Sequence, residues 1–236
     1  KKNLKRFIWY ITPALPIAVN NMDFWTSTLI KFGIVAAGIT VGYIREEKLT
    51  ETNRLFWLFL AVAGAGEILE WMMAVYFKNN FPLYHVFRPL TYSLLTYALT
   101  TELGRLKKIF RLTIPAVWIA AYLNGKYLQA PFDHLNTVII SITCLLHILQ
   151  VLFYIALLFD RYNWNQTLYH HSFWIAMGLL IHSIISFLTL GIHNFLETDG
   201  QKAVIPFLII SEWIFYTSFV LNLLIQKNEP ASKSGS

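Results

Sequence analysis

Four ionisable side chains stand inside apolar stretches on either side of a short polar break, Lys78-Asn79-Asn80. Glu67 and Glu70 precede the break, and His85 and Arg88 follow it. If the two stretches form a helical hairpin, the rise of about 1.5 Å per residue places Glu70 and Arg88 at similar depths, roughly 10 Å from the turn. An unpaired ionised group at such a depth in lipid costs at least ~2.5–3.5 kcal/mol. We therefore expect Arg88 to pair with Glu70 or Glu67.

The hairpin supports two interpretations. In the first, the charged residues form a structural ion pair that fixes the two helices against each other. In the second, Arg88 neutralises only one of the two acids, and the other acid is a protonatable group or part of a ligand site. The residue types alone are compatible with both interpretations.

His147 and His182 form a second constellation, because each lies near the middle of its own apolar segment and the two segments are consecutive. Polar residues at helical spacing place both histidines on polar faces, which turn inward in membrane bundles. Each histidine alone is explained by a hydrogen bond to a neighbouring helix. Together with Glu212 they would also suit a zinc or iron site, or a proton relay. The two imidazoles could instead ligate a haem, with Gly178 providing space.

Several other kinds of chemistry lack their sequence signatures. The last apolar segment contains no lysine for a retinal Schiff base, and the chain has no Walker sequence, selectivity-filter run or arginine ladder. The serines lack the Gly-x-Ser-x-Gly elbow of serine hydrolases. With a single cysteine, Cys144, the chain cannot form an intrachain disulfide.

The composition indicates which elements position these residues. Apolar residues make up 56% of the 236 residues and charged residues only 14%, whereas soluble domains contain about 25% charged residues. The apolar segments are separated by short polar breaks, and most reach the length of about 20 residues that a membrane-spanning helix needs. They predict an all-α, polytopic bundle of eight transmembrane helices, over approximately Phe7–Met22, Phe24–Ile44, Leu55–Phe77, Phe81–Thr101, Ile109–Tyr127, Leu135–Phe159, Tyr169–Ile192 and Ala203–Ile225.

The basic residues predict the orientation of this bundle. If all eight segments span, fourteen of the 19 basic residues fall on one side of the membrane and three on the other, and the positive-inside rule then makes both termini cytoplasmic. This distribution also accounts for the net charge of +6 without nucleic acid as a partner. The first segment, with Pro13 and Pro16, could instead be an anchor helix or a cleaved signal, which leaves seven spans. We expect one transmembrane domain over residues 1–226, a mobile polar tail over 227–236, and a multi-pass protein of the plasma (inner) membrane.

The hairpin sequence Asn79-Asn80-Phe-Pro-Leu-Tyr-His, followed by Pro89 and Tyr92, resembles a hairpin in small, uncharacterised bacterial seven-helix membrane proteins. The preceding helix end at Ile44-Arg45 and the Lys48-Leu49-Thr50 linker are similar too. The resemblance covers the second to fourth segments. It implies a seven-helix architecture for segments two to eight, with the first segment added, and it implies no activity.

This chain differs from the family pattern at two positions of the hairpin. The family pattern has a carboxylate where Thr91 stands here, and a small polar residue where Arg88 stands here. The resemblance therefore does not carry over an ion or ligand site.

The leading functional prediction is a membrane protein that binds a small molecule, a lipid or an ion in a buried polar cavity, for sensing, signalling or transport. The predicted cavity residues are Glu67, Glu70, His85, Arg88, Tyr92, His147, His182, Glu212 and Tyr216, with Tyr84 as a further hydroxyl. The main alternative is a metal-dependent membrane enzyme acting on lipids, with metal ligands His147, His182 and Glu212. Either Glu67 or Glu70 would then be its general base. A b-type haem protein and a scaffold acting through homo-oligomers are further alternatives.

Overall fold

The computed structural model describes residues 24–170, 172–193, 196 and 198–225, and this part of the chain is helical without β-strands. The α-helices are α2 (Phe24–Ile44), α3 (Glu51–Tyr76), α4 (Phe81–Thr100), α5 (Lys107–Tyr127), α6 (Thr137–Arg161), α7 (Trp164–Leu168), α8 (Phe173–Thr189) and α9 (Thr198–Ile225). Two short 3-10 helices, η1 (Glu46–Lys48) and η2 (Gly104–Leu106), lie in the connections. The all-α prediction is confirmed.

The predicted segments two to six agree with α2 to α6 to within about one helical turn at each end. The predicted seventh segment, Tyr169–Ile192, begins four residues before α8, because the five-residue helix α7 ends at Leu168 and α8 begins at Phe173. Asn163 begins α7 with a capping box, in which its side chain accepts from the Gln166 backbone N–H and the Gln166 side chain accepts from the Asn163 N–H. The predicted first segment and the predicted tail lie outside the described residues.

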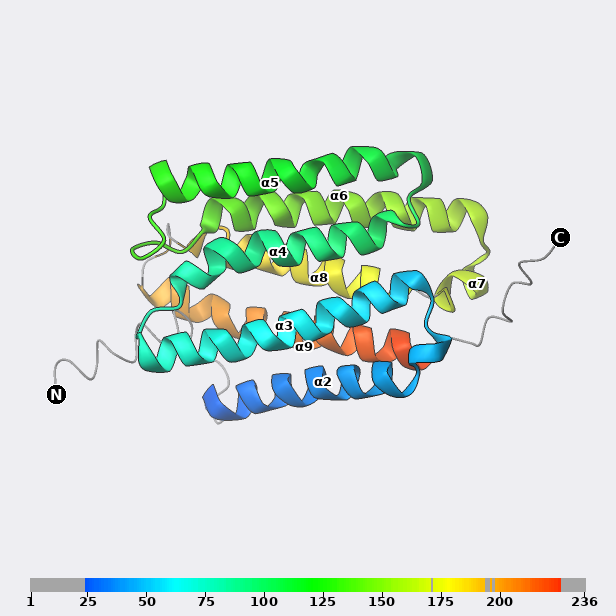
Figure 1. Ribbon diagram of the computed structural model, residues 1–236, viewed down its shortest axis with the longest axis horizontal. Coiled ribbons are helices and arrows are strands. Elements are labelled where there is room, and N and C mark those ends of the chain that lie inside the picture. Colours follow the sequence, from blue (N-terminus) through cyan, green and yellow to red (C-terminus); the bar gives the residue numbers. More distant parts are fainter. Residues whose placement is uncertain (1–23, 171, 194–195, 197, 226–236) are drawn as a thin grey trace.

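The long helices run roughly side by side as a bundle, with α2 and α5 at opposite edges (Figure 1). α3 and α4 form the predicted hairpin, and α4 also packs against α5 and α6. At the other edge α2 packs against both α3 and α9, while α8 lies between α6 and α9. The first and last helices of the described residues, α2 and α9, are therefore neighbours, so their residues can meet inside one site.

Side chains tie the helix ends together at both ends of the bundle. The Asn79 side chain accepts from the Phe81 backbone N–H at 2.9 Å and donates to the Phe132 carbonyl at 2.8 Å, which joins the α3–α4 turn to the α5–α6 connection. At the opposite end the Arg45 guanidinium donates to the Leu223 carbonyl and to the Leu224 carbonyl of the last turn of α9. A cation at the last carbonyls of a helix complements its dipole.

Small residues bring α2 and α3 into close contact. A β-carbon at Gly42 would lie 2.3 Å from Trp57 Cδ1, and one at Gly38 would lie 2.4 Å from Leu60 Cδ2. The Trp57 indole N–H donates to the Ile39 carbonyl at 3.0 Å across this contact. The spacing Gly38-x-x-x-Gly42 is a sequence signal for close helix packing, and here the packing is between two helices of one chain. These glycines are thus already used inside the bundle and do not support a homo-oligomer surface.

The interior is apolar next to the site. Phe56 and Phe59 of α3 pack against Phe215 and Phe219 of α9, with the Phe59 and Phe219 rings stacked at 5.2 Å between centroids. All four rings are buried. They pack α3 against α9 about two to three turns from Glu67 on α3 and about one to two turns from Glu212 on α9.

Four helices of the described chain are long and apolar enough to cross a membrane, over Thr26–Ile44, Glu51–Tyr76, Thr137–Arg161 and Ala203–Ile225, and Phe173–Thr189 is apolar but shorter. The outer faces of the bundle carry many exposed large apolar side chains, such as Leu112 on α5 and Phe207 on α9. Such a surface matches lipid as the solvent. α4 and α5 have lower hydrophobicity because they contain His85 and Arg88 and, at the start of α5, several basic residues.

Candidate functional site

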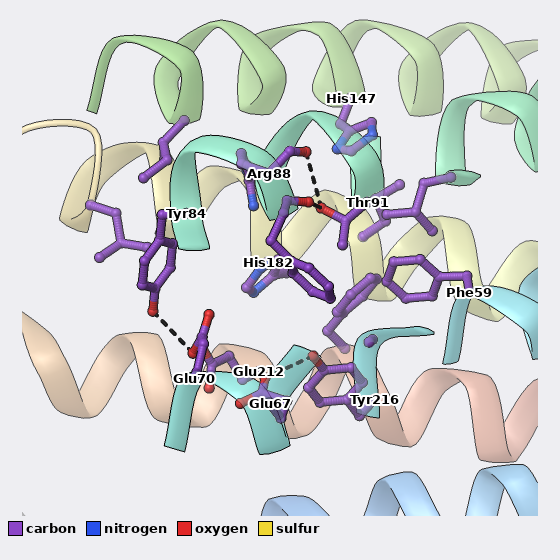
Figure 2. Close-up of a pocket in the computed structure, with 17 residues that line it drawn as sticks. Phe59, Glu67, Glu70, Tyr84, Arg88, Thr91, His147, His182, Glu212 and Tyr216 are labelled. Atoms are coloured by element: carbon purple, nitrogen blue, oxygen red, sulfur yellow. Dashed lines mark hydrogen bonds between the residues drawn. The ribbon is translucent and has the colours of Figure 1, made fainter. Parts of the chain in front are cut away.

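A cavity of about 100 Å³ lies inside the bundle and is lined by side chains of α3, α4, α6, α8 and α9. The polar side chains that line it are Glu67, Glu70, Tyr84, Arg88, Thr91, His147, His182, Glu212 and Tyr216. Figure 2 shows the carboxylates grouped on one side of the cavity, Arg88 and His147 on the other side, and His182 between them. Seven of the nine residues predicted to line a polar cavity therefore line this one, and His85 and Tyr92 do not.

The acidic side of the cavity, made of Glu67, Glu70 and Glu212, is held together by a lysine of α2. Lys31 Nζ lies 2.5 Å from Glu67 Oε2 and 3.2 Å from Glu212 Oε2. The Tyr216 hydroxyl donates to the other oxygen of Glu67 at 3.0 Å. Side-chain exposures of 16% for Lys31, 14% for Glu67 and 25% for Glu212 indicate that this three-residue cluster is largely removed from solvent. One ammonium thus neutralises one of the two charges that it contacts.

Glu70 is the remaining carboxylate of the acidic side. It accepts a hydrogen bond from the Tyr84 hydroxyl at 3.3 Å, across the α3–α4 hairpin. Within the described residues it has no ion pair shorter than 4.0 Å. The three carboxylates therefore share one close ammonium, which leaves an excess of negative charge on this side when all three are ionised.

The predicted pairing of Arg88 with Glu70 or Glu67 is wrong. Arg88 Nε donates to Thr143 Oγ1 at 2.8 Å, and an Nη2 N–H points to Cys144 Sγ at 2.8 Å. Both acceptors are neutral and belong to α6. α4 packs against α6 as well as against α3, and the guanidinium turns to the α6 side. Counting residues from the hairpin turn gives depth, but it does not give the rotation of a helix about its axis.

The two histidines both line the cavity, as predicted, but in different environments. The His182 ring lies against Phe215, and its two nitrogens are within 3.2 Å of Ser211 Oγ and Ser186 Oγ. His147 is 3% exposed, and its Nε2 has no hydrogen-bond partner among the described residues. A buried imidazole nitrogen without a protein partner is available to a bound molecule.

The predicted metal ligands do not assemble into a metal site. No group of three or more His, Cys, Asp or Glu side chains in the described residues could hold a metal ion. Glu212 faces Lys31 instead, and both His182 nitrogens are next to serine hydroxyls. Gly178 does not provide the space that the haem alternative requires. Ser218 fills that space, and its Oγ would lie 2.3 Å from a β-carbon at Gly178.

Two of the predicted cavity residues lie elsewhere. His85 Nε2 is 3.2 Å from the His134 carbonyl, so His85 joins the first turns of α4 to the α5–α6 connection. The Tyr92 hydroxyl is hydrogen bonded to Thr113 and accepts from Gln150 Nε2 at 3.2 Å, within a polar cluster of α4, α5 and α6. Neither residue lines the cavity.

Lys31 is a residue of the acidic side that the sequence analysis did not assign to the site. Its position within an apolar segment was the available signal, since a charge inside a span needs a partner. The missing information was that α2 lies against α9, which brings Lys31 and Glu212 together across 181 positions of sequence.

The fold and the site together define a class: an all-helical bundle with several helices apolar enough to span a membrane and a charged cavity inside it. No family model, no curated protein and no solved structure matches this chain.

Proposed function

We propose that this chain is a polytopic membrane protein that binds a small polar molecule or ion in the cavity between α3, α4, α6, α8 and α9, for sensing or for transport. The observation that carries the proposal is the convergence of three carboxylates, a guanidinium and two imidazoles on a single cavity. Ionisable groups inside a bundle of apolar helices are costly, and they are found where they bind or move a solute.

The size of the cavity limits the ligand. A water molecule occupies about 30 Å³ of liquid, and drug-sized ligand sites are about 300–1,000 Å³. A cavity of about 100 Å³ suits a few water molecules, an ion, a very small organic solute or the headgroup of a lipid. The proposal therefore concerns small polar ligands.

The proposed topology is the predicted one, with the seven long helices α2 to α6, α8 and α9 crossing the membrane and the first apolar segment as an eighth span or an anchor. The short connections within the described residues and the apolar outer faces support this arrangement. The resemblance of the hairpin to small bacterial seven-helix proteins supports it too. Both termini are proposed to be cytoplasmic, in the plasma (inner) membrane.

The proposal requires that a polar molecule can enter the cavity, and cysteine accessibility tests this requirement. Thr91 lines the cavity, whereas Thr96, on the same helix, is fully buried against Gln150. In a Cys144→Ser background, which keeps a hydroxyl acceptor for Arg88, we expect a small charged methanethiosulfonate to modify Thr91→Cys.

Thr96→Cys in the same background is the matched control, and we expect it to stay unmodified in the folded protein. Reaction of Thr91→Cys at the rate of Thr96→Cys would contradict the proposed function, because a closed cavity binds no solute. Intact-protein mass spectrometry of the purified, folded variants over time measures the modification rates of Thr91→Cys and Thr96→Cys.

A further inference from the structure

Two groups of opposite charge type line the cavity without an ion-pair partner among the described residues: the Glu70 carboxyl group on its acidic side and the Arg88 guanidinium on its other side. We infer that the ligand is a small zwitterion, whose ammonium group lies at Glu70 and whose carboxylate or phosphate lies at Arg88. This inference rests on the proposed function and names the chemical class of its ligand.

The acidic side is suited to an ammonium group. An ammonium already occupies it, because Lys31 Nζ bridges Glu67 and Glu212. Glu70, one helical turn from Glu67 on α3, has the Tyr84 hydroxyl as its only hydrogen-bond partner among the described side chains. With three carboxyl groups and one lysine that contacts two of them, the cluster has a third carboxyl group left for a second, external ammonium. A charge-assisted hydrogen bond to Glu70 would satisfy the oxygen that Tyr84 leaves open.

The opposite side is suited to an anionic group. A guanidinium has five N–H donors, and Arg88 directs two of them to the neutral acceptors Thr143 and Cys144. His147 adds a ring nitrogen, Nε2, that has no hydrogen-bond partner in the described part of the chain, and it lines the same cavity. Arginine binds carboxylate and phosphate oxygens with paired N–H groups, so a buried Arg88 beside an open imidazole nitrogen favours an oxyanion.

The two sides do not neutralise each other directly. Among the described residues, the ion pairs within 4.0 Å around the cavity join Lys31 to Glu67 and Glu212, and none joins Glu70 to Arg88. His182 lies between the two sides (Figure 2). A simple cation would leave Arg88 without a counter-ion, and a simple anion would leave Glu70 without one. A dipolar molecule satisfies both.

A cavity of about 100 Å³ restricts the zwitterion to a short one. Two sources carry this chemistry: a free amino acid with few carbon atoms, and the phosphoethanolamine headgroup of a lipid. Both place an ammonium group a few bonds away from an oxyanion, so both would contact the same residues.

A series of ω-amino acids tests the inference. Glycine, β-alanine and γ-aminobutyrate carry the same two charges at increasing separation, while ethylamine and acetate each carry one. With the purified full chain in detergent, we expect at least one zwitterion to raise the unfolding midpoint and to bind at least about tenfold more tightly than either single-charge control.

Variants assign the two ends of the ligand. In Glu70→Gln we expect the preferred zwitterion to bind no better than acetate, and in Arg88→Gln no better than ethylamine. Arg88→Lys keeps the positive charge and should retain part of the preference for the zwitterion over ethylamine. If Arg88→Lys still binds the zwitterion, loss of binding in Arg88→Gln is due to the lost charge and not to misfolding. Glu47→Gln and Arg111→Gln are matched controls outside the cavity, and they should bind like the unaltered chain.

Nanodiscs distinguish the two sources. If the protein unfolds at a higher temperature in phosphatidylethanolamine than in phosphatidylglycerol nanodiscs, and Glu70→Gln and Arg88→Gln abolish this difference, the ligand is the lipid headgroup. If a free amino acid stabilises the protein in detergent, the ligand is the free amino acid. Either result supports the inference. Equal binding of ethylamine and the zwitterions would overturn it in favour of a cation site. Binding of neither source, while Thr91→Cys still reacts, would overturn it and leave the proposed function intact; an unreactive Thr91→Cys would remove both.

Discussion

At the scale of single residues, Lys31 is the cation that compensates two of the three carboxylates on the acidic side of the cavity. Its ammonium lies 2.5 Å from Glu67 and 3.2 Å from Glu212, so one side chain of α2 compensates acids of α3 and α9. Attraction between such partly buried charges offsets the loss of their hydration only when geometry and hydrogen bonds are good. The Tyr216 hydroxyl supplies the additional hydrogen bond to Glu67.

Replacing Lys31 with methionine, which keeps most of the side-chain volume, should destabilise the folded protein by about 3–5 kcal/mol, because it leaves the Glu67 and Glu212 carboxylates without their cation. Thermal unfolding of the purified protein in detergent measures the loss. Lys108→Met, at an exposed position of α5, is the control and should change little. The double variant Lys31→Met/Glu67→Gln should recover part of the loss; an unfolding midpoint in Lys31→Met equal to that of the unaltered protein would disprove this role.

Tyr216 offers a smaller and independent test of the same cluster. In Tyr216→Phe the 3.0 Å hydrogen bond to Glu67 is lost while the ring stays, so we expect a loss of about 1.5–3 kcal/mol, the range for hydrogen bonds to charged groups. Tyr122→Phe, on an exposed face of α5, should be neutral. Unfolding of both variants in the same detergent gives the comparison, and equal midpoints would show that the hydroxyl contributes nothing.

The sequence could predict several residues of the site but not their partners. Glu67, Glu70, Arg88 and the histidines were identifiable because a charge inside an apolar segment is expensive wherever it points. Their partners were not identifiable, because partners depend on helix rotation and on which helices are neighbours. Arg88 faces α6 instead of α3, and His85 reaches the His134 carbonyl outside the cavity. Both depend on the rotation of α4 about its axis.

At the scale of elements, the α2–α3 contact positions Lys31. α2 approaches α3 closely because Gly38 and Gly42 leave room for Leu60 and Trp57. The Trp57 N–H bond to the Ile39 carbonyl fixes the register of the two helices. Unlike the partners of Arg88, this contact was predictable from the sequence, since a Gly-x-x-x-Gly spacing on an apolar helix is itself a packing signal.

Two glycines of the same helix give a matched pair of substitutions. A β-carbon at Gly42 would lie 2.3 Å from the Trp57 ring, whereas one at Gly33 has no neighbouring atom within 4 Å. We expect Gly42→Ala to destabilise the bundle by about 1–3 kcal/mol through overpacking. Gly33→Ala should be neutral or stabilise α2 by up to about 1 kcal/mol, because alanine has the higher helix propensity. Thermal unfolding orders the two variants, and a Gly42→Ala variant as stable as Gly33→Ala would show that α2 does not rely on this contact.

At the scale of the whole molecule, charge is distributed unevenly between the two ends of the bundle. The end with η1 and η2 has the basic residues Arg45, Lys48, Arg54, Arg105, Lys107, Lys108, Arg111 and Arg161. The opposite end, where Asn79 bonds to the Phe132 carbonyl, has Lys78 and Lys126 among the residues with described side chains. Because basic loops stay on the cytoplasmic side, the end with η1 and η2 should face the cytoplasm.

Single cysteines at the two ends test this orientation. Glu47 in η1 and Asp133 in the α5–α6 connection are both exposed, while the native Cys144 is fully buried and is replaced by serine to remove its background. A membrane-impermeant maleimide should label Asp133→Cys in intact cells, because that loop faces outward. It should label Glu47→Cys only after the membrane is permeabilised. The reverse pattern would invert the proposed topology, and labelling of both positions in intact cells would be incompatible with helices that carry these loops to opposite sides of a membrane.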